Sequence, residues 1–431
     1  MAADHNLDAQ NAAENEVEGG EEYLDPNDVL IEAPGDGDAY MEDPDDDEGD
    51  DRRGAEEDQQ GPQEGDDEIV FEDNSIQQFP THQKPVFAVA VHPTLPIAAS
   101  GGEDDMGYLW DINDGQQIAR LSGHTDSVSC TAFSADGTMV VTGGMDGKVR
   151  VWRKIASDPS GKQWEFLTEI VGPDEVMFLR WHPKGNVLLA GANDSTLWLW
   201  QLPSGKTLQV FAGHNGSVQA GDFTPDGKHI ATGDGNGSLI LWDPRSPAPL
   251  WKLTGADGRY SLKGGITALG INPSSSLVVV GGSAGGIRVV NLAKGTVVGA
   301  LEGHDPGESI EAIEFLEFGA GASIGQGSGI MATGGTDGKI CIWDLAVMKL
   351  RSTLQHDDAV TTLVSHPQPN GHILTSGSVD QTLKTWDARA GKLLQEHLGH
   401  QGPVFKAALT VDGEVVVSAS DDGVCLVFNT T

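Results

Sequence analysis

The feature that most constrains this chain of 431 residues is a block of about 45 residues that recurs eight times. In the second copy, Gly123-His124 opens the block, Asp136-Gly137 and Asp146-Gly147 lie inside it, and Trp152 closes it. The eight closing residues are Trp110, Trp152, Trp200, Trp242, Val290, Trp343, Trp386 and Phe428. A repeat of this length is typical of a four-stranded sheet repeated around an axis. The sequence therefore predicts an all-β fold, an eight-bladed β-propeller.

Six copies also carry a histidine, a hydroxyl residue and an Asp or Asn at fixed distances from the closing residue. These sets are His82/Ser100/Asp104/Trp110, His124/Thr142/Asp146/Trp152, His214/Thr232/Asn236/Trp242, His304/Thr333/Asp337/Trp343, His356/Ser376/Asp380/Trp386 and His400/Ser418/Asp422/Phe428. The pattern resembles the WD-repeat family, in which the imidazole bridges the carboxylate to the hydroxyl and the hydroxyl reaches the indole N–H. Serine, histidine and aspartate can also form a catalytic triad, but an enzyme has one such site and this arrangement recurs in six blades. We therefore expect a structural network, no catalytic residues and no enzymatic activity.

Copies three and five depart from the pattern. Copy three has Gly172-Pro173 and Ala190 in place of the histidine and hydroxyl, and copy five has Val280 and Ala284. Because a lone buried polar member would lack a partner, we expect these two blades to be held by apolar packing alone. Copy six is longer because residues 318–329 form a Gly/Ser-rich insertion, which predicts a flexible surface loop.

The chain divides into two parts of different composition. Residues 1–78 hold 29 acidic residues against only Arg52 and Arg53, out of a net charge of −39 for the whole chain. Such a segment cannot bury enough apolar surface to offset its ordering entropy, so residues 1–68 are predicted to be a disordered acidic tail. Residues 69–431 are predicted to form the propeller. We expect an N-terminal strand near residues 69–80 to pair with the last blade and close the ring.

Several classes of function lack support in the sequence. Cys130, Cys341 and Cys425 are neither paired by spacing nor arranged as metal ligands, so we expect no metal and no cofactor. The chain has no basic, apolar leader and no run long enough to cross a bilayer, which predicts a cytoplasmic protein. A closed ring leaves no sheet edge that demands a partner, so we expect a monomer.

In WD-repeat proteins the residues just after each histidine and just before each aspartate face outward around the channel. By this resemblance, the acidic residues of that face are Glu103, Asp126, Asp174, Glu175, Glu308, Glu311, Asp357, Asp358 and Asp421, and Phe87, Met177 and Phe405 join them. Lys84 is the one basic residue at these positions. Carboxylates beside aromatic rings suit an Arg/Lys-rich peptide and repel nucleic acid and anionic membranes. These twelve residues are therefore predicted to bind a basic protein segment.

Longer strings are similar to the angio-associated migratory cell protein family. They are Ser100 to Asp105, His124 to Val128, and the Trp181-His182-Pro183 motif that precedes Trp198-Leu199-Trp200. The fungal branch of that family implies a dedicated chaperone, which binds the basic N-terminal segment of large-subunit ribosomal protein ten and delivers it for 60S assembly. The resemblance extends the expected partners to pre-60S particles. We expect the acidic tail to add a diffuse second contact, although a role in solubility alone stays open.

Two other classes of function stay open. One is a general WD-repeat scaffold or substrate receptor in a signalling or ubiquitin-ligase complex. The other is a propeller enzyme or an acidic histone chaperone. An enzyme would need one reactive cluster that the other blades lack, and the sequence shows none. A histone chaperone would depend mainly on the tail, so deletion of residues 1–68 would abolish its binding.

Overall fold

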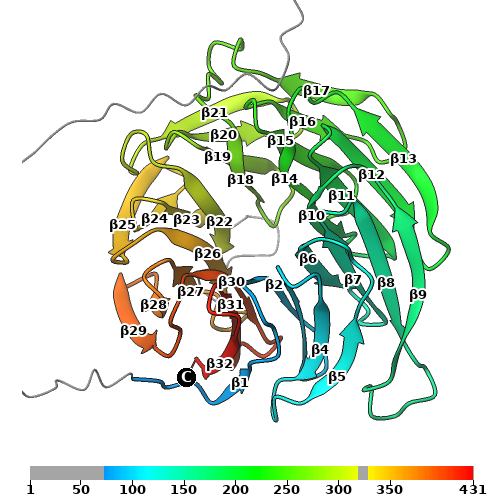
Figure 1. Cartoon of the computed structure of the whole chain (residues 1–431). Helices are drawn as coiled ribbons and strands as arrows, with labels where there is room; N and C mark the ends of the chain where they lie inside the picture. Colours follow the sequence, from blue (N-terminus) through cyan, green and yellow to red (C-terminus); the bar gives the residue numbers. More distant parts are fainter. Residues whose placement is uncertain (1–71, 319–328, 431) are drawn as a thin grey trace, which may run out of the picture. The chain divides into compact units, whose positions relative to one another are not determined.

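The computed structural model describes residues 72–318 and 329–430. They form eight four-stranded antiparallel sheets arranged in a ring (Figure 1), which confirms the predicted eight-bladed β-propeller. The described residues contain no helix long and apolar enough to span a membrane. The predicted tail (residues 1–68) and residues 319–328 of the predicted loop lie outside the described residues.

Each blade has an inner strand at the axis, two middle strands and an outer strand (Figure 1). The inner strands are β2 (Val86–Val91), β6 (Val128–Phe133), β10 (Val176–Trp181), β14 (Val218–Phe223), β18 (Ile266–Ile271), β22 (Ile310–Leu316), β26 (Val360–Ser365) and β30 (Val404–Leu409). The second strands are β3 (Ile97–Gly102), β7 (Met139–Gly144), β11 (Val187–Ala192), β15 (Ile230–Asp234), β19 (Leu277–Gly282), β23 (Ile330–Gly335), β27 (Ile373–Ser378) and β31 (Val415–Ser420).

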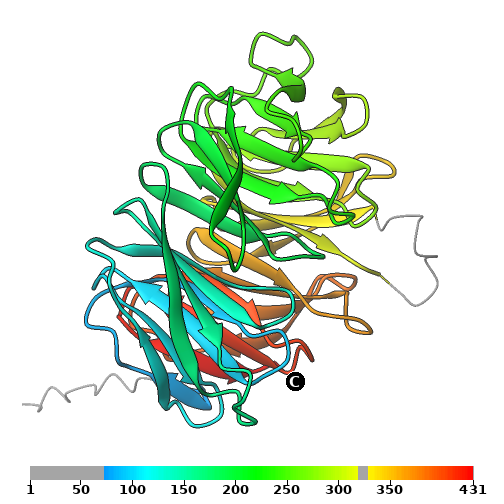
Figure 2. The same ribbon diagram turned by 90° about the vertical axis from the view of Figure 1, so that its right-hand side faces the viewer.

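The third strands carry the closing residues of the repeats. They are β4 (Gly107–Asp111), β8 (Lys148–Lys154), β12 (Thr196–Gln201), β16 (Leu239–Trp242), β20 (Ile287–Asn291), β24 (Lys339–Asp344), β28 (Leu383–Asp387) and β32 (Cys425–Asn429). The outer strands are β5 (Gln117–Leu121), β9 (Trp164–Val171), β13 (Lys206–Ala212), β17 (Pro249–Leu253), β21 (Thr296–Leu301), β25 (Lys349–Gln355), β29 (Lys392–His397) and, in the last blade, β1 (Gln77–Phe79). Figure 2 shows the ring from the side, with strands running between its two faces.

The glycines that end the second strands allow neighbouring blades to pack closely. A Cβ atom on Gly101 would lie 2.5 Å from the Val128 side chain in the next blade. One on Gly102 would lie 2.8 Å from Nδ1 of His82. Since real Cβ atoms do not approach so closely, the Gly-Gly pair lets β3 contact both the next blade and its own histidine.

All eight inner strands carry a β-bulge at the same place, where one residue has no partner in the second strand. The bulged residues are Phe87, Ser129, Met177, Gln219, Thr267, Glu311, Thr361 and Phe405. Bulges re-aim side chains near functional sites. All eight of these residues line a cavity on the ring axis, and we call this set the mouth of the channel.

The ring closes where the start of the described chain meets its end. β1 pairs with β32, with Gln77 opposite Val427 and Phe79 opposite Cys425. The Phe79 ring is buried and stacks on Trp110 of the first blade, with centroids 4.9 Å apart and planes 1° from parallel. Asn74 exchanges side-chain hydrogen bonds with the backbone of Glu396 and Leu398, each 2.9 Å long. The closing segment therefore joins the seventh, eighth and first blades.

We expect replacement of Phe79 by alanine to destabilise the ring strongly. Removing a buried ring from a packed core costs about 3–5 kcal/mol, because apolar contacts are lost and a cavity is left. Urea denaturation of the full chain measures the effect. Gln78 is exposed on the same strand, so Gln78→Ala is the matched control and should change the free energy of unfolding by less than ~0.5 kcal/mol. Equal effects of the two variants would contradict the closure described here.

Candidate functional site

The recurring histidine, hydroxyl and acid form a buried network that ties two loops of each blade together. In the second blade, His124 lies 3.0 Å from Asp146 through Nδ1 and 2.8 Å from the Thr142 hydroxyl through Nε2. The corresponding bonds form in the first, fourth, sixth, seventh and eighth blades. Each histidine joins the loop before an inner strand to the turn between the second and third strands. Both loops therefore lie on one face of the ring, which we call the upper face.

Two details of the predicted network are wrong. In the fourth blade the histidine partner is Asp234, 2.9 Å from His214 Nδ1, and the amide of Asn236 donates instead to the Asn215 carbonyl. The carboxylate at the end of β15 reaches the imidazole directly, so the turn residue is not needed. Among the six predicted networks of the described ring, the bond from the closing indole to the hydroxyl forms only at Trp242, Trp343 and Trp386.

Trp110 is the clearest exception to the predicted indole bond. Its N–H has no acceptor among the described residues. The same ring stacks face to face on Phe79. Packing across the seam therefore sets its orientation, rather than the hydrogen bond to Ser100.

Burial determines the protonation of this network. It lowers the pKa of His124 and of His214, although the neighbouring carboxylate opposes the shift. For Asp234, burial acts to raise the pKa, but hydrogen bonds from His214 and the Ser238 backbone outweigh it and hold the pKa at about 2. In the second and fourth blades the network therefore pairs an ionised carboxylate with a neutral imidazole at neutral pH, and its groups are occupied by bonds within the blade.

The third and fifth blades lack this network, as predicted. Leu262 takes the place of the histidine in the fifth blade, since a Cβ on Gly282 would lie 3.1 Å from it. In the third blade the indole N–H of Trp200 has no acceptor among the described residues. Apolar clusters surround both positions.

The seventh blade holds a second polar chain that the sequence analysis missed. His366 contacts Thr375 (2.9 Å), Thr375 contacts Thr385 (3.0 Å), and Thr385 contacts His397 (2.9 Å). All four side chains are buried. Burial lowers the pKa of both His366 and His397 to about 4, so both rings are neutral at neutral pH. The two threonines occupy middle-strand positions that hold alanine, valine, leucine or isoleucine in the other blades, and this difference was the signal available in the sequence.

The predicted acidic residues lie on the upper face but do not all meet at one point. Asp126, Asp174, Glu308, Asp357, Asp358 and Asp421 are exposed, and Glu103 and Glu175 are half-buried. Glu103 pairs with Lys84 at 3.6 Å, and Glu308 accepts a 2.7 Å hydrogen bond from Thr336. The structure also places Lys148, Lys339 and Lys384 beside carboxylates of the network. The carboxylates therefore form an outer circle with some internal neutralisation.

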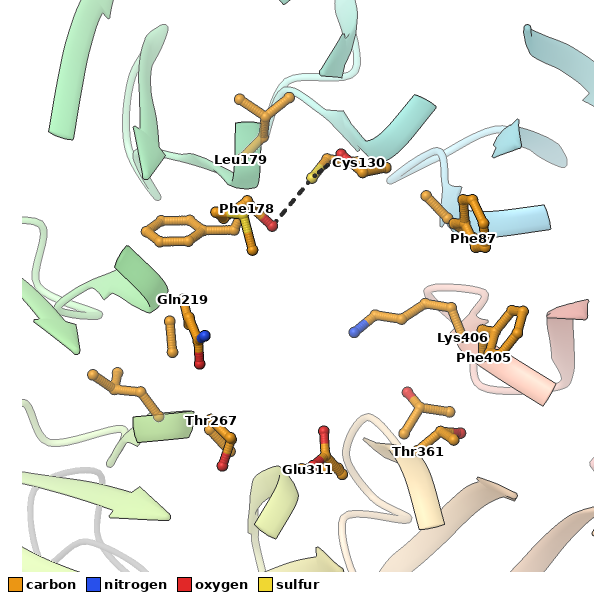
Figure 3. A pocket seen from close by; sticks show the side chains of 18 of the residues that line it. Phe87, Cys130, Phe178, Leu179, Gln219, Thr267, Glu311, Thr361, Phe405 and Lys406 are labelled. Atoms are coloured by element: carbon orange, nitrogen blue, oxygen red, sulfur yellow. Dashed lines mark hydrogen bonds between the residues drawn. The ribbon is translucent and has the colours of Figure 1, made fainter. Parts of the chain in front are cut away.

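The other four predicted residues come together at the mouth of the channel. Phe87, Met177, Glu311 and Phe405 all line a cavity of about 450 Å³ on the axis. The rings of Phe87 and Phe405 lie 5.8 Å apart, on the first and last inner strands, with Glu311 on another part of the wall (Figure 3). The cavity is also lined by Glu314, and its aromatic rings suit an apolar group of a bound segment.

Three other residues of the mouth bind the neighbouring blade. The hydroxyls of Ser129, Thr267 and Thr361 donate to the carbonyls of Val176, Ile310 and Val404, at 2.9, 2.6 and 2.6 Å. These side chains connect successive inner strands. The mouth therefore contains residues that hold blades together and residues whose side chains face the cavity.

The channel also contains charged residues that the sequence analysis missed. Lys406 follows the bulge of β30 and extends from the wall into the open centre (Figure 3). Deeper in the channel, Arg180 pairs with Asp222 at 3.6 Å, and Glu314 accepts a 2.6 Å hydrogen bond from Ser365. Burial raises the pKa of Asp222 and of Glu314, and it lowers the pKa of Lys406 together with the charge of Arg180. The channel wall therefore holds Lys406 and Arg180 together with the acidic side chains of Asp222 and Glu314, inside the outer circle of carboxylates.

The described residues offer no group of three or more histidine, cysteine or acidic side chains that could hold a metal. Cys341 and Cys425 are buried, Cys130 is half-buried, and all three are free thiols. Burial raises the pKa of Cys341 to about 12, which keeps it protonated.

Comparison with known proteins places these features in a family. The family described as "WD domain, G-beta repeat" matches residues 73–111, 115–153, 164–201, 205–243, 295–344, 348–387 and 391–429. The human angio-associated migratory cell protein is 32% identical over 361 residues, covering 83% of this chain and 80% of the human protein. The chain belongs to the WD-repeat family, in the group of the angio-associated migratory cell protein. No repeat is matched over β18–β20, where this WD-repeat ring lacks the histidine network.

Two further proteins resemble the WD-repeat ring over most of its length. The ribosome assembly protein SQT1 of Saccharomyces cerevisiae is 25% identical over 392 residues, covering 84% of this chain and 88% of that protein. The crystal structure of Chaetomium thermophilum Sqt1 bound to the N-terminus of the ribosomal protein L10 is 29% identical, with a TM-score of 0.77. It matches 83% of this chain and the whole of that one, 100%.

We expect the stability of this WD-repeat ring to fall as the pH drops from about 6.5 towards about 4. The pKa of His366 and of His397 is about 4 in the fold, against 6.5 for the ordinary side chain. Between pH 6.5 and about 4 the unfolded chain binds more protons at these two histidines than the folded chain does. Their contribution to the free energy of unfolding is therefore complete above pH 6.5 and is lost as the pH falls towards about 4. Urea unfolding at several pH values measures the slope. His397→Gln should make the slope shallower, and an unchanged slope would contradict the assigned role.

Proposed function

We propose that this protein is a dedicated chaperone of ribosomal protein L10, which binds the basic N-terminal segment of that protein on the upper face and delivers it for large-subunit assembly. One observation carries the proposal: 83% of the chain matches the whole of a solved Sqt1 structure that is bound to the N-terminus of L10. The protein SQT1 of Saccharomyces cerevisiae, described as a ribosome assembly protein, is a second relative along most of the chain.

The upper face supports the same proposal on physical grounds. Exposed carboxylates such as Asp126, Asp357 and Asp421 surround a mouth that holds Glu311 and two phenylalanine rings. Arginine and lysine side chains of a bound segment can pair with the carboxylates while their aliphatic parts lie on the rings. A basic ribosomal segment held in this way is kept from RNA phosphates, which would otherwise attract it.

A second candidate function is a general WD-repeat scaffold or substrate receptor. The observation that favours it is the greater identity to the human angio-associated migratory cell protein, 32% against 25% for SQT1 of Saccharomyces cerevisiae. A scaffold would bind several unrelated partners on its faces. A dedicated chaperone should instead prefer one basic sequence over others of equal charge, and this difference separates the two functions.

We expect the full chain to bind a synthetic peptide with the N-terminal sequence of L10 more tightly than a scrambled peptide of the same composition. Isothermal titration calorimetry at low and high salt measures both affinities, and the affinity should fall with salt because charges attract across the interface. Asp357→Lys places a cation on the upper face and should weaken binding by about tenfold.

Glu414→Lys is the matched control for this substitution. Glu414 is exposed in the turn between β30 and β31, on the face opposite the upper face, and the charge change is the same. Its affinity should stay close to that of the unchanged protein. Equal binding of the two peptides would contradict a dedicated chaperone, and equal loss in the two variants would contradict a site on the upper face.

A further inference from the structure

The position after each bulge forms a second circle of residues around the channel. Seven blades hold an uncharged residue there, and the eighth holds Lys406. The seven are Ala88, Cys130, Phe178, Ala220, Ala268, Ala312 and Thr362. A lysine at one of eight equivalent positions is not required by the fold, because the other blades form the same strand pairing without it.

Lys406 lies in the cavity as a cation without a close counter-ion. Its side chain is exposed to the cavity, and it forms no ion pair within the described part of the chain. It extends from the wall beside Phe405 into the centre of the opening (Figure 3), and the wall of the ring surrounds it. Arg180 lines the same cavity, as do the acidic residues Glu311 and Glu314. Because water is limited there, a third cation in the cavity would be repelled more strongly than at the surface.

The mouth around Lys406 offers apolar surface to a bound segment. Phe87 and Phe405 lie side by side, and Met177 is 38% exposed on the same circle. Glu311 belongs to the same circle, and the exposed side chains beyond it include the carboxylates of Asp126, Asp357 and Asp421. The upper face is thus negative at the rim, and Lys406 places a cation at its centre.

We propose that Lys406 acts as a charge filter, so that the residue of a bound basic segment lying over the channel is uncharged and apolar. That residue contacts Phe87, Phe405 and Met177, and the arginine and lysine side chains on either side of it reach outward to the rim. The filter fixes the position of the segment on the face, since only an uncharged residue between basic ones fits over the axis. This inference rests on the proposed function, because it concerns the same bound segment.

Two short arginine-rich peptides test the filter on the full chain. They differ only at the central position, which is leucine in one and arginine in the other. General attraction to an acidic face would favour the arginine-centred peptide, which has the larger charge. The filter predicts the opposite order, with the leucine-centred peptide binding about tenfold more tightly. Calorimetric titration at constant ionic strength measures both affinities.

Substitutions of Lys406 should reverse this preference. Lys406→Glu places a carboxylate under the mouth and should make the arginine-centred peptide the tighter ligand, and Lys406→Met should remove most of the preference for leucine. Lys294→Glu is the charge-matched control, because Lys294 is exposed in the turn between β20 and β21, away from the upper face. It should keep the order found for the unchanged protein.

The outcomes separate the filter from the proposed function. If the unchanged protein bound neither of the two peptides nor the L10 segment, both the filter and the proposed function would be overturned. Binding of the L10 segment together with tighter binding of the arginine-centred peptide would leave the chaperone function standing and overturn the filter. The same order in Lys406→Glu and in the unchanged protein would also overturn it. Circular dichroism of each variant shows that any change in order arises in a folded ring.

Discussion

Closure of the ring by the pairing of β1 with β32 is the interaction on which the rest of the structure depends. Each blade packs its second strand against the next inner strand, as β3 does where Gly101 lies against Val128. Such contacts are complete in every blade only when the last blade meets the first. Phe79 provides that contact, because it belongs to the outer strand of the eighth blade and packs on Trp110 of the first. The channel and its mouth exist only in the closed ring.

Within the closed ring, buried imidazoles fix the loops that form the upper face. His124 holds the backbone before β6 to Asp146, and the same carboxylate accepts from the Thr125 backbone at 3.0 Å. A loop fixed in this way presents its exposed acids without further ordering, so less conformational entropy is lost when a partner binds. The polar network that resembles a catalytic triad therefore contributes to function by positioning other residues.

The sequence predicts the number of blades and the face of the acidic loops because both follow from a repeated pattern. Its failures occur where one copy differs from the others in three dimensions. Asn236 stands at the expected position in the turn, but Asp234 lies closer to the imidazole. Lys406 was missed because the prediction took the residues next to each histidine and aspartate, and the bulge directs the next strand residue into the channel as well. His366 and His397 were missed as a pair because they are connected only by hydrogen bonds through two threonines, which lie on the middle strands between them.

The arrangement of charge on the upper face has a consequence for recognition. Carboxylates alone would attract any basic segment and hold it in many positions, because long-range attraction falls slowly with displacement along an acidic surface. The cation of Lys406, which reaches into the centre of the opening, removes the positions in which a basic side chain lies over the channel. Attraction at the rim then determines how fast a segment arrives, and repulsion at the centre determines which residue occupies the mouth. Specificity for one basic sequence among many can arise in this way from a single lysine in an acidic ring.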